Sequence, residues 1–125
     1  MPKNDLVVLT VDDDMINLKL LKSMLMKSAK VAEVIEAKNG SDAVDVLKSR
    51  DDIDLVLLDI IMPVMSGIEM LQVIRADTNL RQVPVVVLTT DETKKCEALD
   101  VGANDFLMKP IRSDDLFKKI DAVLI

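Results

Sequence analysis

The 125-residue chain contains no histidine and a single cysteine. Without histidine it cannot carry a Ser-His triad, a His-ligated zinc site or a phosphohistidine of its own. Because Cys96 has no partner in the chain, no internal disulfide can form, which favours a reducing, cytoplasmic compartment. Any chemistry must therefore use carboxylates, hydroxyls and lysines.

The sequence also lacks long apolar runs and an excess of positive charge. No apolar stretch approaches the roughly 20 residues of a membrane span, and the first residues do not combine a basic region with a long apolar core. The 16 basic and 22 acidic residues give a net charge of -6. This charge argues against a nucleic-acid or anionic membrane surface and favours a cation as the polyvalent partner. The length predicts one domain over residues 1–125.

Five apolar runs of strand length alternate with segments of helical period. The strand candidates cover residues 5–11, 31–36, 53–59, 83–89 and 104–108. Three of them, at 5–11, 53–59 and 83–89, are nearly continuous Val, Leu and Ile, which is typical of strands covered on both faces. With right-handed crossovers, this order predicts a three-layer α/β domain built on a parallel sheet.

Each helical segment is expected to bury one apolar stripe. The five expected stripes are Ile16, Leu20, Leu21, Met24 and Leu25; Ala43, Val44 and Leu47; Ile68, Leu71 and Ile74; Cys96, Leu99 and Val101; and Leu116, Ile120 and Leu124. Turn and cap residues place helix starts after Asn39 and at Ser113, and Pro63 and Gly67 are expected to bracket a loop.

Polar residues with complementary charges follow four of the predicted strands. They are Asp12, Asp13 and Asp14 after the first strand, Asp59 at the end of the third, Thr89 at the end of the fourth, and Lys109 after the fifth. The carboxyl ends of parallel strands meet at one rim, where α/β sheets gather their function. Two carboxylates about 4 Å apart repel by on the order of 4 kcal/mol at an effective dielectric near 20, so such a cluster requires a cation.

These residue types together suit phosphoryl transfer. Mg²⁺ accepts one or two carboxylates and completes its coordination with water and phosphate oxygens. Thr89 and Lys109 offer a hydroxyl and a fixed positive charge for the phosphoryl oxygens. Asp59 follows four apolar residues and is the candidate nucleophile, since a carboxylate can form an acyl phosphate.

Each residue considered alone has an ordinary structural explanation. The acidic triplet Asp12 to Asp14 is a typical helix start, and Asp59 is a possible loop-entry residue. Thr89 suits any strand, and Lys109 suits a solvated surface. The functional interpretation depends on the sheet topology, which predicts all of them at one rim.

The same residues lie in motifs that resemble the receiver domain of two-component response regulators of the chemotaxis-regulator type. The motifs are "VDDD" at 11–14, "LVLLDIIMPVMSGIE" at 55–69, "VPVVVLTT" at 83–90 and "GANDFLMKPI" at 102–111. The resemblance covers almost the whole chain. It implies a flavodoxin-like fold with strand order 2-1-3-4-5 and a signalling domain that catalyses only its own phosphorylation and dephosphorylation.

By this resemblance, Asp59 accepts a phosphoryl group from a phosphohistidine on a histidine kinase or histidine phosphotransfer protein. The resemblance implies that Asp13 binds Mg²⁺ directly, that Asp12 binds it through water, and that the carbonyl of Ile61 adds a ligand. It also implies that Thr89 and Lys109 contact the phosphoryl oxygens. The family further implies a cis peptide between Lys109 and Pro110.

The resemblance also implies a switch. Phosphorylation would draw Thr89 inward and let Phe106 rotate into the vacated space, changing the surface of the fourth helix, fifth strand and fifth helix. That surface is the expected site for a downstream protein target or a dimer. The resemblance further implies that Ile61 and Asp91 occupy positions that set the lifetime of the phosphoryl group. Ile61 can shield it, and Asp91 can either orient or repel water.

Three alternative functions fit the sequence less well. A hydrolase of the haloacid dehalogenase type would use Asp12 and Asp14 as its D-x-D motif, but Ile16 stands where its threonine is expected, and the chain is too short for a cap domain. A flavodoxin-like cofactor binder would need a phosphate loop in place of three acids. A degenerate receiver would lack the intact site residues. The kinase, the output, and whether the chain acts alone or within a longer regulator stay open.

Overall fold

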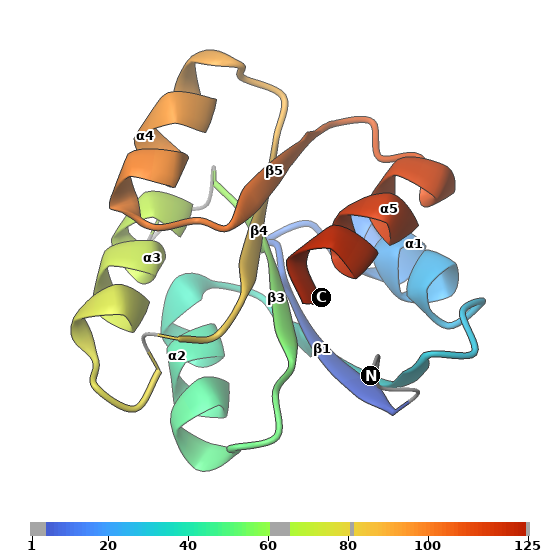
Figure 1. Ribbon diagram of the computed structural model, residues 1–125, viewed down its shortest axis with the longest axis horizontal. Helices are drawn as coiled ribbons and strands as arrows, with labels where there is room; N and C mark the ends of the chain where they lie inside the picture. The colour runs from blue at the N-terminus through green and yellow to red at the C-terminus, as the bar shows by residue number, and fades with distance from the viewer. Residues whose placement is uncertain (1–4, 61–65, 81, 125) are drawn as a thin grey trace.

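The computed structural model describes residues 5–60, 66–80 and 82–124. Strands and helices alternate along these residues (Figure 1). The elements are β1 (Leu6–Val11), α1 (Met15–Leu25), β2 (Val31–Ala37), α2 (Gly40–Ser49), β3 (Leu55–Asp59), α3 (Gly67–Ala76), β4 (Val85–Thr89), α4 (Thr93–Val101), β5 (Asp105–Met108) and α5 (Ser113–Leu124). Every predicted strand is confirmed, with ends that differ by no more than two residues.

The five described strands form one parallel sheet in the order β2-β1-β3-β4-β5, which confirms the predicted flavodoxin-like α/β fold. β1 lies inside the sheet, next to the β2 edge, and β3 lies on the other side of β1, followed in order by β4 and β5. The strand order therefore reverses between β1 and β3. Their carboxyl ends lie side by side at this switch point, which is where ligands bind in folds of this type.

Side chains alternate between the two faces of the sheet. In β3, Val56 and Leu58 join one core cluster, whereas Leu55 and Leu57 join the other. The first cluster is covered by α2, α3 and α4, and the second by α1 and α5, as Figure 1 shows. Because both faces are covered, the central strands are apolar on both sides, and this explains the continuous Val, Leu and Ile runs.

The expected apolar stripe of α1 was wrong for two of its residues. Ile16 is 69% exposed and Leu20 is 54% exposed, while Leu18 is buried with Leu21 and Leu25. At about 100° per residue, Leu18, Leu21 and Leu25 share one face, and Ile16 and Leu20 lie together on the opposite side. The helix therefore has a second, exposed apolar face.

The expected stripe of α4 was wrong for two of its three residues, while Val101 packs partly buried against the core. Cys96 and Leu99 are exposed, and the residue of α4 that is buried against the sheet is Ala98. A small side chain lets the helix lie close to the sheet, and a search for large apolar residues overlooks it. The stripes of α2 and α5 are confirmed, with Leu124 only partly buried.

Side-chain caps fix where three helices begin. Asp14 accepts a 2.9 Å hydrogen bond from the Ile16 amide at the start of α1, and Asn39 accepts one of 2.8 Å from Asp42 at the start of α2. Ser66 caps α3, which begins at Gly67, the residue at which the expected loop ends. Pro63 and Ile61 lie outside the described residues.

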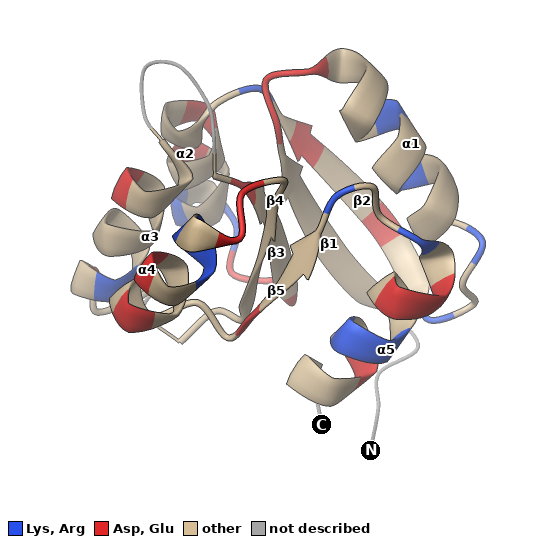
Figure 2. Ribbon diagram, turned by 90° about the horizontal axis from the view of Figure 1, so that it is seen from above, with Lys and Arg blue, Asp and Glu red and all other residues tan. Residues whose placement is uncertain are grey.

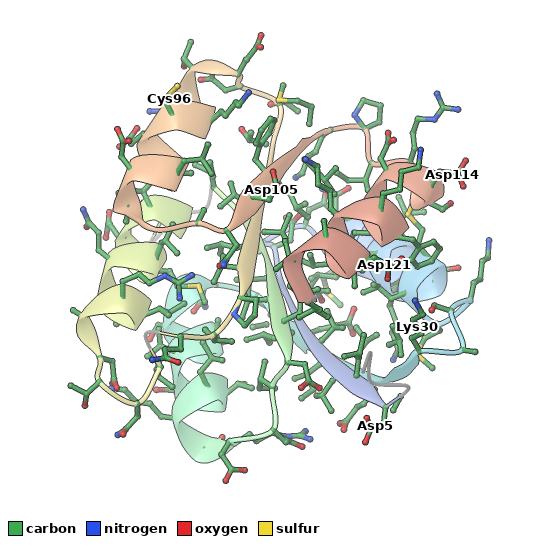
Figure 3. The ribbon with its side chains drawn as sticks, viewed as in Figure 1. Asp5, Lys30, Cys96, Asp105, Asp114 and Asp121 are labelled. Atoms are coloured by element: carbon green, nitrogen blue, oxygen red, sulfur yellow. The ribbon has the colours of Figure 1, made fainter. Side chains whose placement is uncertain are left out.

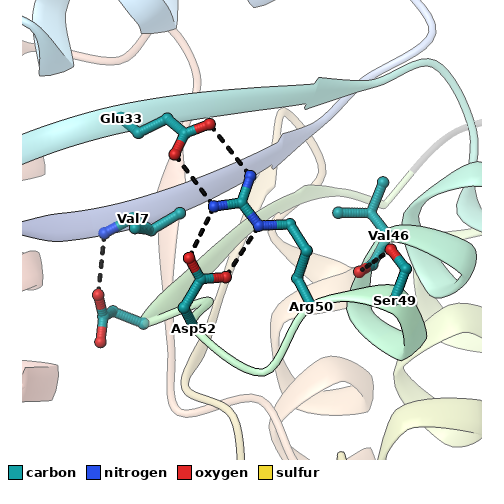
Figure 4. Close-up of polar contacts among 7 residues, drawn as sticks. Val7, Glu33, Val46, Ser49, Arg50 and Asp52 are labelled. Carbon is teal, nitrogen blue, oxygen red and sulfur yellow. Dashed lines mark hydrogen bonds and ion pairs between the residues drawn. The ribbon is translucent and has the colours of Figure 1, made fainter.

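Arg50 joins the end of α2 to the β2 edge of the sheet (Figure 4). Its guanidinium donates two hydrogen bonds to Glu33, of 3.0 and 3.1 Å, and two to Asp52, of 2.7 and 2.8 Å. The hydrogen bonds from Arg50 lower the pKa of Glu33. An open hollow of about 830 Å³ beside Arg50 lies at the end of the sheet opposite the switch point, and Arg50 already has acidic partners there.

Arg75 joins α3 to the segment between α4 and β5. It donates hydrogen bonds to the carbonyls of Gly102 (2.9 Å) and Val83 (2.7 Å) and to Asn104 Oδ1 (2.9 Å). Burial lowers the pKa of this guanidinium. Gly102 has a φ of 121°, a conformation that favours glycine, and an added Cβ there would lie 2.9 Å from Arg75 Cγ. The C-terminal end of α4 is therefore fixed to α3.

Among the described residues, no helix is long and apolar enough to cross a membrane.

Gly67 allows α3 to begin against the end of β3. Its amide donates a 2.8 Å hydrogen bond to the Ile60 carbonyl, and a Cβ at this position would lie 2.6 Å from the Asp59 carbonyl oxygen and from Ile60 Cα. Real Cβ atoms do not approach backbone atoms so closely. Any side chain here would displace the backbone that carries Asp59.

We predict that Gly67→Ala lowers the free energy of unfolding by about 1–3 kcal/mol, because the added methyl group overpacks the end of β3. Urea unfolding measures the change. Val73→Ala is the control, since Val73 is a 37% exposed position in the same helix and should lose less. A Gly67→Ala protein as stable as the parent would contradict this account of the β3–α3 junction.

Candidate functional site

Two carboxylates, one buried and one exposed, follow the carboxyl end of β1 and lie at the switch point. Asp12 follows β1 and is 1% exposed, whereas Asp13 is exposed. Asp12 Oδ1 accepts a 2.9 Å hydrogen bond from the Asp14 amide, which fixes the Asp12 carboxylate against the start of α1. The connection that leads into α1 is the red segment at the top of Figure 2. Asp14 itself caps α1, so this member of the acidic triplet marks a helix start.

Asp59 is the last residue of β3 and is 6% exposed. Lys109 Nζ lies 3.3 Å from Asp59 Oδ1 and 3.4 Å from Asp12 Oδ2. Burying a carboxylate is costly unless a charge compensates it, and this ammonium serves both acids at once. The predicted cis peptide between Lys109 and Pro110 is confirmed.

The carboxylates of Asp12, Asp13 and Asp59 each offer an oxygen, and these atoms lie within 4.8 Å of one another. Three acids at this separation repel strongly, and one lysine does not balance them. Oxygen donors alone suit Mg²⁺, which favours carboxylates over nitrogen or sulfur ligands. The residues present therefore fit the predicted ion. The Ile61 carbonyl, the fourth expected ligand, lies outside the described residues.

Thr89 ends β4 at the same rim and is 1% exposed. Its Oγ1 accepts a 2.9 Å hydrogen bond from the Asp91 amide, and its carbonyl accepts one of 2.8 Å from the Lys109 amide. The neighbouring residue Leu88 pairs in register with Asp59 on β3. The Thr89 hydroxyl is thus held by the turn between β4 and α4.

Asp91 points its carboxylate at α4. Its Oδ1 accepts hydrogen bonds from Thr93 Oγ1 (2.6 Å) and from the Thr93 amide (2.9 Å). These two bonds lower the pKa of Asp91, the side-chain bond contributing most. Asp91 therefore helps to begin α4 and stabilises the turn that holds Thr89. Thr93 had no predicted role, although an acid two residues before a threonine at a helix start is a typical capping pattern.

Phe106 lies in the middle of β5 and is partly buried against the cluster beneath α4. Two lysines contact its ring. Lys95 Nζ lies 4.2 Å and Lys119 Nζ 5.3 Å from the ring centroid. Neither lysine was predicted to belong to the site, because one is on α4 and the other on α5.

A groove of about 420 Å³ extends from the acidic site along α1. Asp12 and Lys109 line its end at the site, and apolar side chains form most of its wall. The lining residues are Asp12, Asn17, Leu20, Leu21, Met24, Leu88, Thr90, Lys109, Pro110 and Ile111. The exposed face of α1, with Met15, Ile16 and Leu20, borders the same end of the molecule.

A sequence model of the response regulator receiver domain matches residues 8–121. The chain belongs to this family. It is a receiver domain of two-component signalling, and the predicted resemblance is confirmed. The protein PilH of Pseudomonas aeruginosa is 36% identical over 119 residues, covering 94% of this chain and 96% of PilH. The transcriptional regulatory protein CpxR of Escherichia coli is 39% identical over 119 residues, which span 48% of CpxR.

Solved receiver domains share the fold. The chemotaxis protein CheY4 of Vibrio cholerae superposes with a TM-score of 0.87 at 30% identity, covering 96% of this chain and 99% of CheY4. The receiver domain of a sensor histidine kinase from Pseudomonas aeruginosa has a TM-score of 0.86 at 28% identity, over 96% of this chain and 98% of that domain. That domain was solved with a magnesium ion coordinated in its active-site cleft.

We predict that Mg²⁺ stabilises this receiver domain through Asp13. At about 100 times the dissociation constant, a ligand of the folded state adds about 2.7 kcal/mol to the free energy of unfolding. Asp13→Asn should lose most of this increment, as measured by thermal unfolding with and without Mg²⁺. Asp14→Asn is the control, because it removes the same charge from the next residue, keeps an oxygen that can cap α1 and leaves the three clustered carboxylates in place. Equal increments in the two variants would rule out this ion site.

Proposed function

We propose that residues 1–125 act as a phosphoacceptor domain in which Asp59 takes a phosphoryl group from a phosphohistidine on a histidine kinase or histidine phosphotransfer protein. The position of Lys109 supports this proposal most. Its ammonium lies 3.3 Å from Asp59, which is one of three clustered acids at the carboxyl ends of the strands. This arrangement places a buried carboxylate beside positive charge. A carboxylate nucleophile for phosphorus needs that combination.

In the proposed reaction, a carboxylate oxygen of Asp59 forms a bond to phosphorus while the phosphorus–nitrogen bond of the donor imidazole breaks. Asp12, Asp13, Asp59 and the Ile61 carbonyl would hold Mg²⁺, which supplies positive charge to the phosphoryl oxygens. The Lys109 ammonium and the Thr89 hydroxyl would bind the same oxygens as their charge develops. Thr89 Oγ1 accepts from the Asp91 amide and donates a long hydrogen bond, of 3.4 Å, to the Asp91 carbonyl. We infer that its proton would leave this long bond for a phosphoryl oxygen.

The proposed output is a change at the surface of α4, β5 and α5. Engaging Thr89 would pull on the turn that holds Asp91 and allow Phe106 to move inward. The altered face would bind a downstream protein target, a fused output domain or a second copy of the domain. Ile61 and Asp91 would set the lifetime of the phosphoryl group. We infer that Asp91 acts through the turn, because its carboxylate is bound to Thr93. The activity is signalling in the cytoplasm, with self-phosphorylation and self-dephosphorylation as its only catalysis.

With Mg²⁺ and acetyl phosphate, the protein is expected to gain the mass of one phosphoryl group by intact mass spectrometry. Asp59→Asn should abolish the gain, because an amide is a far weaker nucleophile than a carboxylate. Asp51→Asn, at an exposed acid away from the rim, should leave it unchanged. Labelling that persists in Asp59→Asn would refute the assignment of the acceptor. Continuous phosphate release over many turnovers would instead indicate a hydrolase.

We further propose that the phosphohistidine partner docks on the exposed apolar face of α1. The donor must bring its imidazole to Asp59, and the groove that begins at Asp12 and Lys109 leads directly onto α1. Ile16 and Leu20 are 69% and 54% exposed beside this groove. An apolar face next to the acceptor favours a partner with a complementary apolar helix face.

Ile16→Ser and Leu20→Ser are expected to slow transfer from a phosphorylated histidine phosphotransfer domain by about tenfold or more, the cost of losing about 1.5 kcal/mol of apolar contact. Labelling by acetyl phosphate should be unchanged, since that donor needs no docking surface. Met26→Ser, an exposed apolar residue just after α1, serves as the control. Equal slowing with both donors would show that these residues act on the site itself and not on docking.

A further inference from the structure

Phe106, the proposed switch residue, lies on β5 at the open edge of the sheet. β5 is the terminal strand of the described sheet and pairs with β4. Figure 3 shows α4 and α5 on opposite sides of β5, with Asp105 labelled between them. Phe106 packs with the cluster beneath α4, whereas α5 buries Leu116 and Ile120 in the cluster on the other face.

A lysine from each of these two helices places its ammonium group close to the Phe106 ring. Lys95 Nζ of α4 lies 4.2 Å from the centroid, and Lys119 Nζ of α5 lies 5.3 Å from it. Because α5 covers the other face, the Lys119 side chain must pass the open edge of the sheet to reach the ring. Asp105 Oδ1 holds it there at 3.0 Å. A cation within about 6 Å of an aromatic centroid is attracted to the ring.

We propose that Lys95 and Lys119 form a cationic brace that holds the Phe106 ring in its partly exposed position, called here the outward state, and so sets the threshold of the switch. This inference rests on the proposed function, in which the ring moves inward once Asp59 carries a phosphoryl group. Inward movement takes the ring away from both ammonium groups. Each contact at a partly exposed site favours the outward state by about two- to fivefold. Losing one should raise the inward population by the same factor.

Fluorine NMR with 4-fluorophenylalanine tests the brace directly. The chain contains two phenylalanines, so a labelled protein has two signals, and Phe117→Leu assigns the one from Phe106. Beryllofluoride with Mg²⁺ serves as the aspartyl phosphate analogue, and the Phe106 signal is followed against its concentration. Lys95→Met and Lys119→Met each remove one charge and keep an unbranched side chain. We expect each to lower the half-conversion concentration about two- to fivefold, and to move the resting Phe106 signal toward its activated position.

The adjacent lysines provide matched controls. Lys94 pairs with Glu97 at 3.7 Å, and Lys118 is exposed on α5, so Lys94→Met and Lys118→Met remove the same charge from the same helices. Both should behave as the parent protein. Asp105→Asn separates the ion pair of Lys119 from its ring contact, and an effect smaller than that of Lys119→Met is expected. Brace variants with the same midpoints and resting signals as the two controls would overturn the proposal.

Failure of the brace is distinguishable from failure of the proposed function. If acetyl phosphate labels Asp59 but the Phe106 signal does not respond to beryllofluoride, the site works and the brace is refuted. If neither labelling nor a beryllofluoride response occurs in the parent protein, the proposed function fails and the brace fails with it. Lys95→Met and Lys119→Met could instead lower stability equally and leave the beryllofluoride midpoints unchanged. That result would refute the brace and show that both lysines only protect the edge of the sheet.

Discussion

The contact on which the rest of the site depends is the one between Lys109 and two buried carboxylates. Asp59 ends an apolar strand, and Asp12 follows another, so each acid is largely removed from water. Leaving either charge unpaired there would be costly, and the lysine, which follows β5, extends past the end of β4 to lie within 3.4 Å of both. The same ammonium also provides the positive charge that a phosphoryl group on Asp59 would need. One side chain therefore compensates both buried charges.

From this centre, local hydrogen bonds extend toward the surface. The Thr89 carbonyl accepts from the Lys109 amide, and the Thr89 hydroxyl accepts from the Asp91 amide. Asp91 in turn begins α4 through Thr93. The candidate acceptor and the candidate output surface are thus joined by a few short contacts in one turn. A receiver domain needs such a connection, because a single phosphoryl group must alter a face that its partner can read.

The sequence was sufficient to predict the parts of the structure that depend on strand pattern and sheet order. Continuous apolar runs identified β1, β3 and β4, and the parallel topology then brought Asp12, Asp59, Thr89 and Lys109 to one rim. Helix faces were less predictable. Large apolar residues such as Ile16 and Leu99 proved exposed, because burial follows helix angle and not side-chain size. The contacts of Phe106 with Lys95 and Lys119 could not be predicted, since they depend on how α4 and α5 pack around an edge strand.

The contacts of Arg75 hold one end of α4 more firmly than the other. Its C-terminal end is followed by Gly102, whose carbonyl Arg75 binds, while its N-terminal end is attached to the turn that holds Thr89. A nine-residue helix is about 13 Å long, so a small displacement at the threonine would tilt α4 about a nearly fixed pivot. The helix would then act as a lever. The greatest travel would fall on its first turn, around Thr93 and Lys94, and the least beside Gly102.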